Sequence, residues 1–165
     1  MNYIDKREIL SEFFQDKGYD LRKFQGFPDN SMVISKALNK EDALNVLDLY
    51  YELFIPVLGG DVLYLKQNGI LDYTNDNWCI DRLNKETYFQ FLKRSIDTSK
   101  DYIKNYRHPF LKDSSILFNI VPFDIENYEG QHQLSSHGDS PSVSYDHFPD
   151  VGKMVFDRIA CHKVT

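Results

Sequence analysis

The stretch NKEDALNVLDLYYELFIP, residues 39–56, carries the clearest structural signal in the chain. Asn39 is a favourable N-cap, and the two acids after it suit the first turn because anions are stabilised at the positive end of a helix dipole. Its apolar side chains follow at helical spacing: Leu44, Leu47, Tyr51, Phe54 and Ile55. Pro56 and then Gly59-Gly60 are typical helix-ending residues. The stretch therefore predicts an amphipathic helix.

Two further helices are predicted, one on each side of this stretch. Residues 3–16 place apolar side chains on one stripe and acids largely opposite, and Gly18 is a suitable stop. Asn84 repeats the capping chemistry of Asn39 and starts a second helical pattern that continues to about Tyr106. Pro109 then closes that pattern, so the sequence predicts three helices in all.

Strand signals are weaker than helix signals. Residues 115–123 form a short apolar run and are the best strand candidate, while residues 61–71 read as a strand and a turn. Residues 73–80 are turn-rich and hold the only tryptophan, and residues 151–161 favour a strand over a helix. We therefore expect an α+β fold: about three helices packed on a small, mostly antiparallel sheet. The length fits a single domain over residues 1–165.

Composition excludes several classes of partner. The chain has 25 acidic and 19 basic side chains and a net charge of −6, so it lacks the basic face of a duplex nucleic-acid binder. Its longest apolar run, residues 53–58, is far shorter than the roughly 20 residues that span a bilayer. The first eight residues are polar and contain no signal-peptide core. These features predict a cytoplasmic protein without a membrane partner.

The segment 126–149 is the place to look for enzyme chemistry. It is long and polar for a loop inside a compact domain, and such loops are commonly functional or disordered. The segment holds three of the five histidines together with two aspartates: His132, His137, Asp139, Asp146 and His147. Their spacing matches neither a metal site on a helix nor a hydrolase nucleophile motif. We therefore expect no catalytic residue, metal or cofactor, and keep as an alternative a small hydrolase-like enzyme that uses His137 or His147 with Asp139 or Asp146.

Charge is distributed in blocks along the chain. Residues 41–84 hold eight acids against two bases, and residues 113–157 hold eight acids against one base. Residues 85–112 between them hold seven bases against three acids. Such blocks commonly form a solvated surface that neutralises itself. The alternative is a basic partner, because complementary charge speeds encounter and aromatic side chains anchor an interface.

Acidic and aromatic residues occur together at two places, and these are the candidate partner-binding residues. They are Asp72, Asp76, Trp78, Asp81, Asp124, Glu126, Tyr128 and Glu129. Among them Trp78 is the expected anchor, although burial in the core is an equally ordinary place for a tryptophan. A nuclease-type domain would suit such a surface because its active site is basic in order to hold phosphate.

In general character the chain resembles a bacterial toxin-immunity protein of the polymorphic or contact-dependent inhibition type. The resemblance rests on small size, acidity, aromatic richness, the mixed α/β pattern and the lack of a catalytic motif. It implies a non-catalytic inhibitor that neutralises a cognate toxin by binding it, commonly over the active site. An adaptor that binds a host protein is the remaining alternative, and it differs only in its partner.

Overall fold

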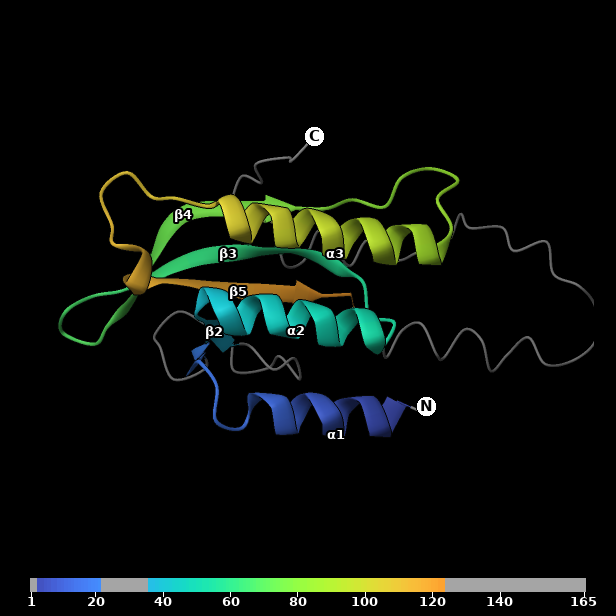
Figure 1. Cartoon of the computed structure of the whole chain (residues 1–165), viewed down its shortest axis with the longest axis horizontal. Helices are drawn as coiled ribbons and strands as arrows, with labels where there is room; N and C mark the ends of the chain where they lie inside the picture. The colour runs from blue at the N-terminus through green and yellow to red at the C-terminus, as the bar shows by residue number, and fades with distance from the viewer. Residues whose placement is uncertain (1–2, 22–35, 124–165) are drawn as a thin grey trace, which may run out of the picture.

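The computed structural model describes residues 3–21 and 36–123 of the chain. Within these ranges three helices accompany one five-stranded antiparallel sheet with the strand order β1-β2-β5-β3-β4 (Figure 1). The elements are α1 (Tyr3–Phe14), β1 (Tyr19–Asp20), β2 (Lys36–Leu38), α2 (Lys40–Glu52), β3 (Val57–Leu65), β4 (Leu71–Cys79), α3 (Tyr88–Asn105) and β5 (Ile116–Pro122). The α+β prediction is confirmed, and the helices and strand expected over residues 3–16, 39–55 and 115–123 are present.

Helix α2 forms as its local sequence predicts. The Asn39 side chain accepts a hydrogen bond from the backbone N–H of Asp42 at 2.9 Å, which satisfies one of the free donors of the first turn. The helix buries one stripe of side chains against the sheet: Ala43, Val46, Leu47 and Tyr50. The cap is the predicted one, but of the predicted apolar stripe only Leu47 is among these buried helical side chains. Leu44 is half-buried, Tyr51 and Phe54 are exposed, and Ile55 is buried beyond the end of the helix.

Helix α3 begins three residues later than predicted. Thr87, and not Asn84, is its N-cap: the Thr87 hydroxyl accepts from the N–H of Gln90 at 3.2 Å, and the Gln90 side chain accepts from the N–H of Thr87 at 2.9 Å. This reciprocal capping box satisfies two donors at once. Residues 83–86 instead form a turn, in which the N–H of Glu86 donates to the carbonyl of Leu83 at 3.1 Å.

The pair Gly59-Gly60 lies within β3 and does not end α2, which corrects the sequence interpretation. A Cβ on Gly60 would lie 2.4 Å from an atom of the Trp78 ring and 2.2 Å from the carbonyl oxygen of Asn119. Gly60 pairs with Trp78 across the sheet, so the missing side chain leaves room for the indole. The two glycines therefore permit close packing between strands, and they do not end a helix.

Strand β4 replaces the turn-rich segment predicted for residues 73–80. It pairs with β3 from Leu71 to Cys79, and the register shifts between the pairs Asp61–Asn77 and Leu63–Tyr73, where β4 has the extra residues. Asn75 adopts a left-handed backbone (φ 68°), and its polar neighbours resemble those of a turn. The long antiparallel partner outweighs these local signals.

The main core lies between the sheet and helices α2 and α3, which run side by side across one face (Figure 1). Its largest fully buried side chains include Trp78, Phe91 and Phe118. A smaller cluster on the other face of the strands contains Leu21, Ala37, Leu63, Leu71 and Leu117. Because α2 and α3 cover the main core, their outer faces and their ends form much of the described surface.

Candidate functional site

The three predicted acids of the β4 region do not form one surface patch. Asp72 lies at the start of β4 and Asp81 follows its end, and a nine-residue strand is about 25 Å long. Asp72 forms an ion pair with Lys66, and this interaction, with the backbone N–H of Tyr73, lowers the pKa of the Asp72 carboxyl. Asp76 accepts a hydrogen bond from the Tyr106 hydroxyl at 2.6 Å. Asp72 and Asp76 thus have partners inside the protein.

Trp78 is a core residue and is not available as a surface anchor, which corrects the prediction for this side chain. It is completely buried, its indole N–H donates to the Ser99 hydroxyl at 3.0 Å, and its ring stacks on Tyr102 at 4.7 Å between centroids. A buried tryptophan with a satisfied N–H stabilises the fold. A partner could contact it only if the core opened.

The remaining predicted residues lie outside the described ranges. These are Asp124, Glu126, Tyr128 and Glu129, together with the whole 126–149 segment and its histidines. Within residues 3–21 and 36–123, no group of three His, Cys, Asp or Glu side chains is placed to hold a metal ion. No helix in the same part of the chain is long and apolar enough to cross a membrane.

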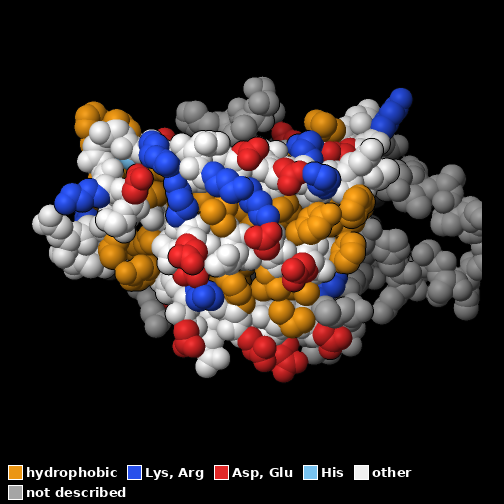
Figure 2. Space-filling model, in the orientation of Figure 1, with side chains coloured by type: hydrophobic (Ala, Val, Ile, Leu, Met, Phe, Trp, Pro, Cys, Tyr) orange, Lys and Arg blue, Asp and Glu red, His pale blue; other side chains and the backbone are white. Residues whose placement is uncertain are grey.

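Three exposed aromatic side chains gather where the end of α2 meets the start of α3. They are Tyr51, Phe54 and Phe89, exposed by 37%, 57% and 53%, and we call them the aromatic patch. The rings of Tyr51 and Phe89 lie 6.4 Å apart. Figure 2 shows hydrophobic side chains gathered at this end of the two helices. Clustered exposed apolar side chains are characteristic of interaction sites, whereas isolated ones are ordinary.

The backbone around Phe54 explains why its ring points outward. Phe54 adopts a left-handed conformation (φ 56°), which a bulky side chain rarely takes. The Tyr88 hydroxyl donates to the Phe54 carbonyl at 2.7 Å, and the N–H of Ile55 donates to the carbonyl of Tyr50 at 2.8 Å. These bonds hold the change of chain direction after α2, and Ile55 is buried in the core. Sequence periodicity placed Phe54 on the buried stripe of α2 because it could not show that the helix stops at Glu52.

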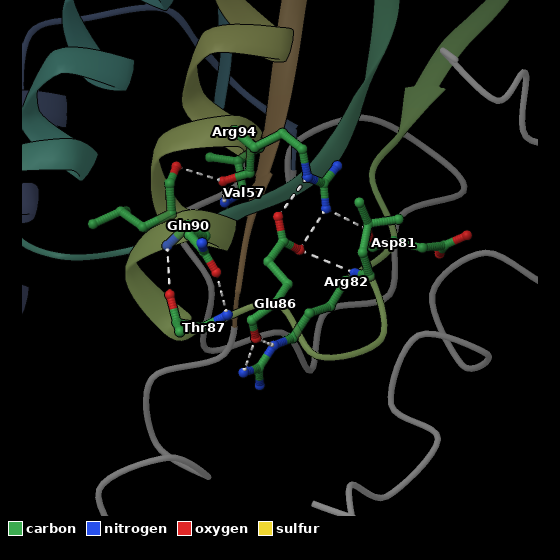
Figure 3. Close-up of polar contacts among 10 residues, drawn as sticks. Val57, Asp81, Arg82, Glu86, Thr87, Gln90 and Arg94 are labelled. Carbon is green, nitrogen blue, oxygen red and sulfur yellow. Dashed lines mark hydrogen bonds and ion pairs between the residues drawn. The ribbon is translucent and has the colours of Figure 1, made fainter.

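A network centred on Glu86 fixes the loop that leads into α3 (Figure 3). The Glu86 carboxylate, only 7% exposed, accepts from two Arg94 guanidinium nitrogens at 2.7 and 2.8 Å. The Glu86 carbonyl accepts from Arg82, and Arg94 also donates to the Asp81 carbonyl. The Arg94 hydrogen bonds are the main reason that the pKa of Glu86 lies below its usual value. This network fixes the first turn of α3 and therefore the position of Phe89.

Charged side chains of both signs lie on the helical face beside the aromatic patch. Lys93 and Lys100 of α3 form ion pairs with Asp97 and with Asp48 of α2. Glu52 is exposed at the end of α2, next to Tyr51. Helix α1 adds a stripe of exposed acids, seen along the lower edge in Figure 2: Asp5, Glu8, Glu12 and Asp16. Spacings of three and four residues place these acids on one side of α1.

Comparison with known families resolves what class of protein carries this surface. Residues 30–122, more than half of the 165-residue chain, match the family model of Immunity protein 40. The chain belongs to the Immunity protein 40 family. No curated protein and no solved structure matches it. Membership of an immunity-protein family indicates a toxin-neutralising role and is consistent with a protein that is not an enzyme.

The match to Immunity protein 40 includes the parts that build the aromatic patch. It extends from before β2 to the end of β5 and so contains α2, α3 and the Glu86 network. Helix α1 and strand β1 lie outside the matched range. The resemblance to toxin-immunity proteins is thus confirmed at the level of the family, whereas the residues that bind a toxin have to be argued from the surface.

Proposed function

We propose that this member of the Immunity protein 40 family binds a cognate toxin domain of basic character and blocks it without catalysing a reaction. Family membership is the observation that supports this proposal. A protein that neutralises by binding needs an exposed, pre-formed surface, and the α2–α3 end of the described chain provides one. A basic toxin, such as a nuclease-type domain, is the partner that the charge of this surface favours.

Electrostatics supports the basic character of the toxin. The acids of α1 and α2 are exposed over one side of the molecule, and two lysines of the neighbouring α3 are paired with Asp48 and Asp97. Exposed like charges of this kind attract an oppositely charged partner and raise its association rate. The acids predicted from sequence at Asp81, Asp124, Glu126 and Glu129 remain proposed contributors to the same attraction, whereas Asp72 is paired with Lys66.

The alternatives have less support. The hydrolase-like reading depends on His137, Asp139, Asp146 and His147, which lie outside the described residues. The adaptor reading differs from toxin binding only in its partner, and membership of an immunity-protein family favours a toxin.

The direct test is binding and inhibition of the toxin encoded next to this chain. Purified chain and toxin domain should form a stable complex on gel filtration, and toxin activity should fall to zero at one equivalent of a tightly binding chain. A toxin with a basic surface should associate more slowly as salt rises. Undiminished toxin activity in the presence of excess folded chain would contradict the proposed function.

A further inference from the structure

We infer that the aromatic patch, Tyr51, Phe54 and Phe89, is the apolar anchor that holds the cognate toxin. This inference rests on the proposed function and adds to it the surface that the toxin covers. The proposal follows from three properties of the patch: its exposure, its fixed geometry and the charge around it.

The first property of the patch is exposure: its rings are not packed into the core. Phe54 and Phe89 each leave more than half of their surface to solvent. The Phe89 ring lies 6.4 Å from the Tyr51 ring, and Phe54 follows Tyr51 by three residues. Interface hot spots are enriched in aromatic side chains and cluster near the centre of the contact. Helix α2, the residues just after it and helix α3 contribute the three rings, and all lie in the family-matched region, so the patch belongs to the common fold and not to a terminal extension.

The geometry of Phe54 is held by its surroundings. Its neighbours Leu53 and Ile55 are 4% and 0% exposed, and its carbonyl accepts from Tyr88. A glycine would adopt the same left-handed backbone without steric cost, yet the chain has phenylalanine there. Residues kept in unfavourable backbone conformations cluster at functional sites. An exposed ring that costs conformational energy is therefore best explained by a role in binding.

The charge around the patch selects the occupant. Glu52 is exposed beside Tyr51, whereas Asp48, one turn earlier on α2, is paired with Lys100. A toxin surface with an apolar centre and surrounding Lys or Arg side chains is complementary to this arrangement. The other strongly exposed aromatic, Phe110 at 91%, lies beyond the opposite end of α3 with exposed Arg107 and Lys112 near it in the chain. That end has the wrong charge for a basic partner.

The substitution Phe54→Gly tests the inference while it protects the fold. Glycine removes the ring and suits the left-handed backbone, so thermal stability should be unchanged or higher. Affinity for the toxin, measured by calorimetry with the full-length chain, should fall at least about 30-fold, as expected for a hot-spot residue. Phe89→Ala should weaken binding by a similar factor. Phe110→Ala is the matched control, because it removes a more exposed ring at the other end, and its affinity should stay within about 2-fold of wild type.

The outcomes separate this inference from the proposed function. If the wild-type chain does not bind the toxin, the proposed function fails. If the wild-type chain binds and both Phe54→Gly and Phe89→Ala bind equally well, the function stands and the aromatic patch is not the anchor. An equal loss of affinity in Phe110→Ala would also overturn the inference, because it would place the contact elsewhere.

Discussion

At the scale of single residues, the fate of Trp78 depends on a glycine in another strand. The sequence marks Trp78 as a large aromatic side chain beside acids, a combination that suits both an interface and a core. The structure buries it because Gly60, its cross-strand partner, has no side chain and Ser99 on α3 accepts its indole N–H. Sequence reasoning could not resolve the choice, since neither Gly60 nor Ser99 is near Trp78 in the chain.

Gly60→Ala is predicted to destabilise the protein strongly. The new methyl group would lie 2.2 Å from the Asn119 carbonyl oxygen and 2.4 Å from the Trp78 ring, so the sheet or the ring must shift. We expect a loss of about 3 kcal/mol in the free energy of unfolding, measured by urea denaturation. Gly69→Ala is the control: its Cβ meets nothing within 4 Å, and only the positive φ of 78° opposes it. Its cost should be about 1 kcal/mol, and an equal effect of both substitutions would contradict this account of the packing.

At the scale of elements, a feature could be predicted where its sequence signals are local. It could not be predicted where it depends on residues distant in the chain. Helix α2 begins at the Asn39 cap, as the sequence indicated, although its buried stripe includes only Leu47 of the predicted apolar residues. The start of α3 was misplaced because Asn84 is a good local N-cap, whereas the loop before the helix is held by Glu86 and Arg94, which are eight residues apart. Strand β4 was missed because its polar residues become a strand only by pairing with β3.

Thr87→Ala should destabilise the protein by about 1 kcal/mol, because it removes the acceptor for the Gln90 N–H and breaks the capping box. Asn84→Ala is the matched control at the position that sequence alone selected as the cap. Its effect on the thermal unfolding midpoint should be small. A larger loss in Asn84→Ala than in Thr87→Ala would place the start of α3 at the earlier residue.

The Glu86–Arg94 pair predicts a pH dependence of stability. Because the pKa of Glu86 is lower in the folded state than its ordinary value of 4.5, its ionised form stabilises the fold above that pH. This contribution is lost as the pH falls below 4.5 and through the lower pKa of the folded state. Glu86→Gln should cost about 2 kcal/mol at pH 7 and should flatten the decline in stability as the pH falls below the ordinary pKa of Glu86. If the free energy of unfolding has the same pH dependence in the wild type and in Glu86→Gln, this role is ruled out.

At the scale of the whole molecule, many of the exposed acids among residues 3–21 and 36–123 lie on α1 and α2, away from the strand where sequence reasoning placed candidate acids. The acids of α1 and the outward acids of α2 are exposed, whereas Asp72 and Asp76 of β4 bind partners inside the protein. The block structure of charge could be read from the sequence, but which acids share a surface depends on the tertiary fold.

The triple variant Glu8→Gln, Glu12→Gln, Asp16→Asn should slow association with a basic toxin. Loss of three exposed charges on one side of α1 should lower the association rate about 5-fold at low salt and reduce its salt dependence, with little change in the dissociation rate. Asp72→Asn is the comparison, since its carboxylate is already paired with Lys66. Its association rate, measured by stopped flow, should stay within about 2-fold of wild type. If the triple variant associates with the toxin at the wild-type rate, the toxin approaches another side of the molecule.

The central claim is that a toxin covers the end of the molecule where α2 meets α3. Hydrogen–deuterium exchange of the full-length chain, alone and in complex with its cognate toxin, tests this claim most directly. The account predicts slower exchange in the complex at residues 52–55 and 82–90, which surround the aromatic patch, and little change at residues 106–113. Protection confined to residues 106–113 or to the β3–β4 turn, with no change around Phe54 and Phe89, would contradict it.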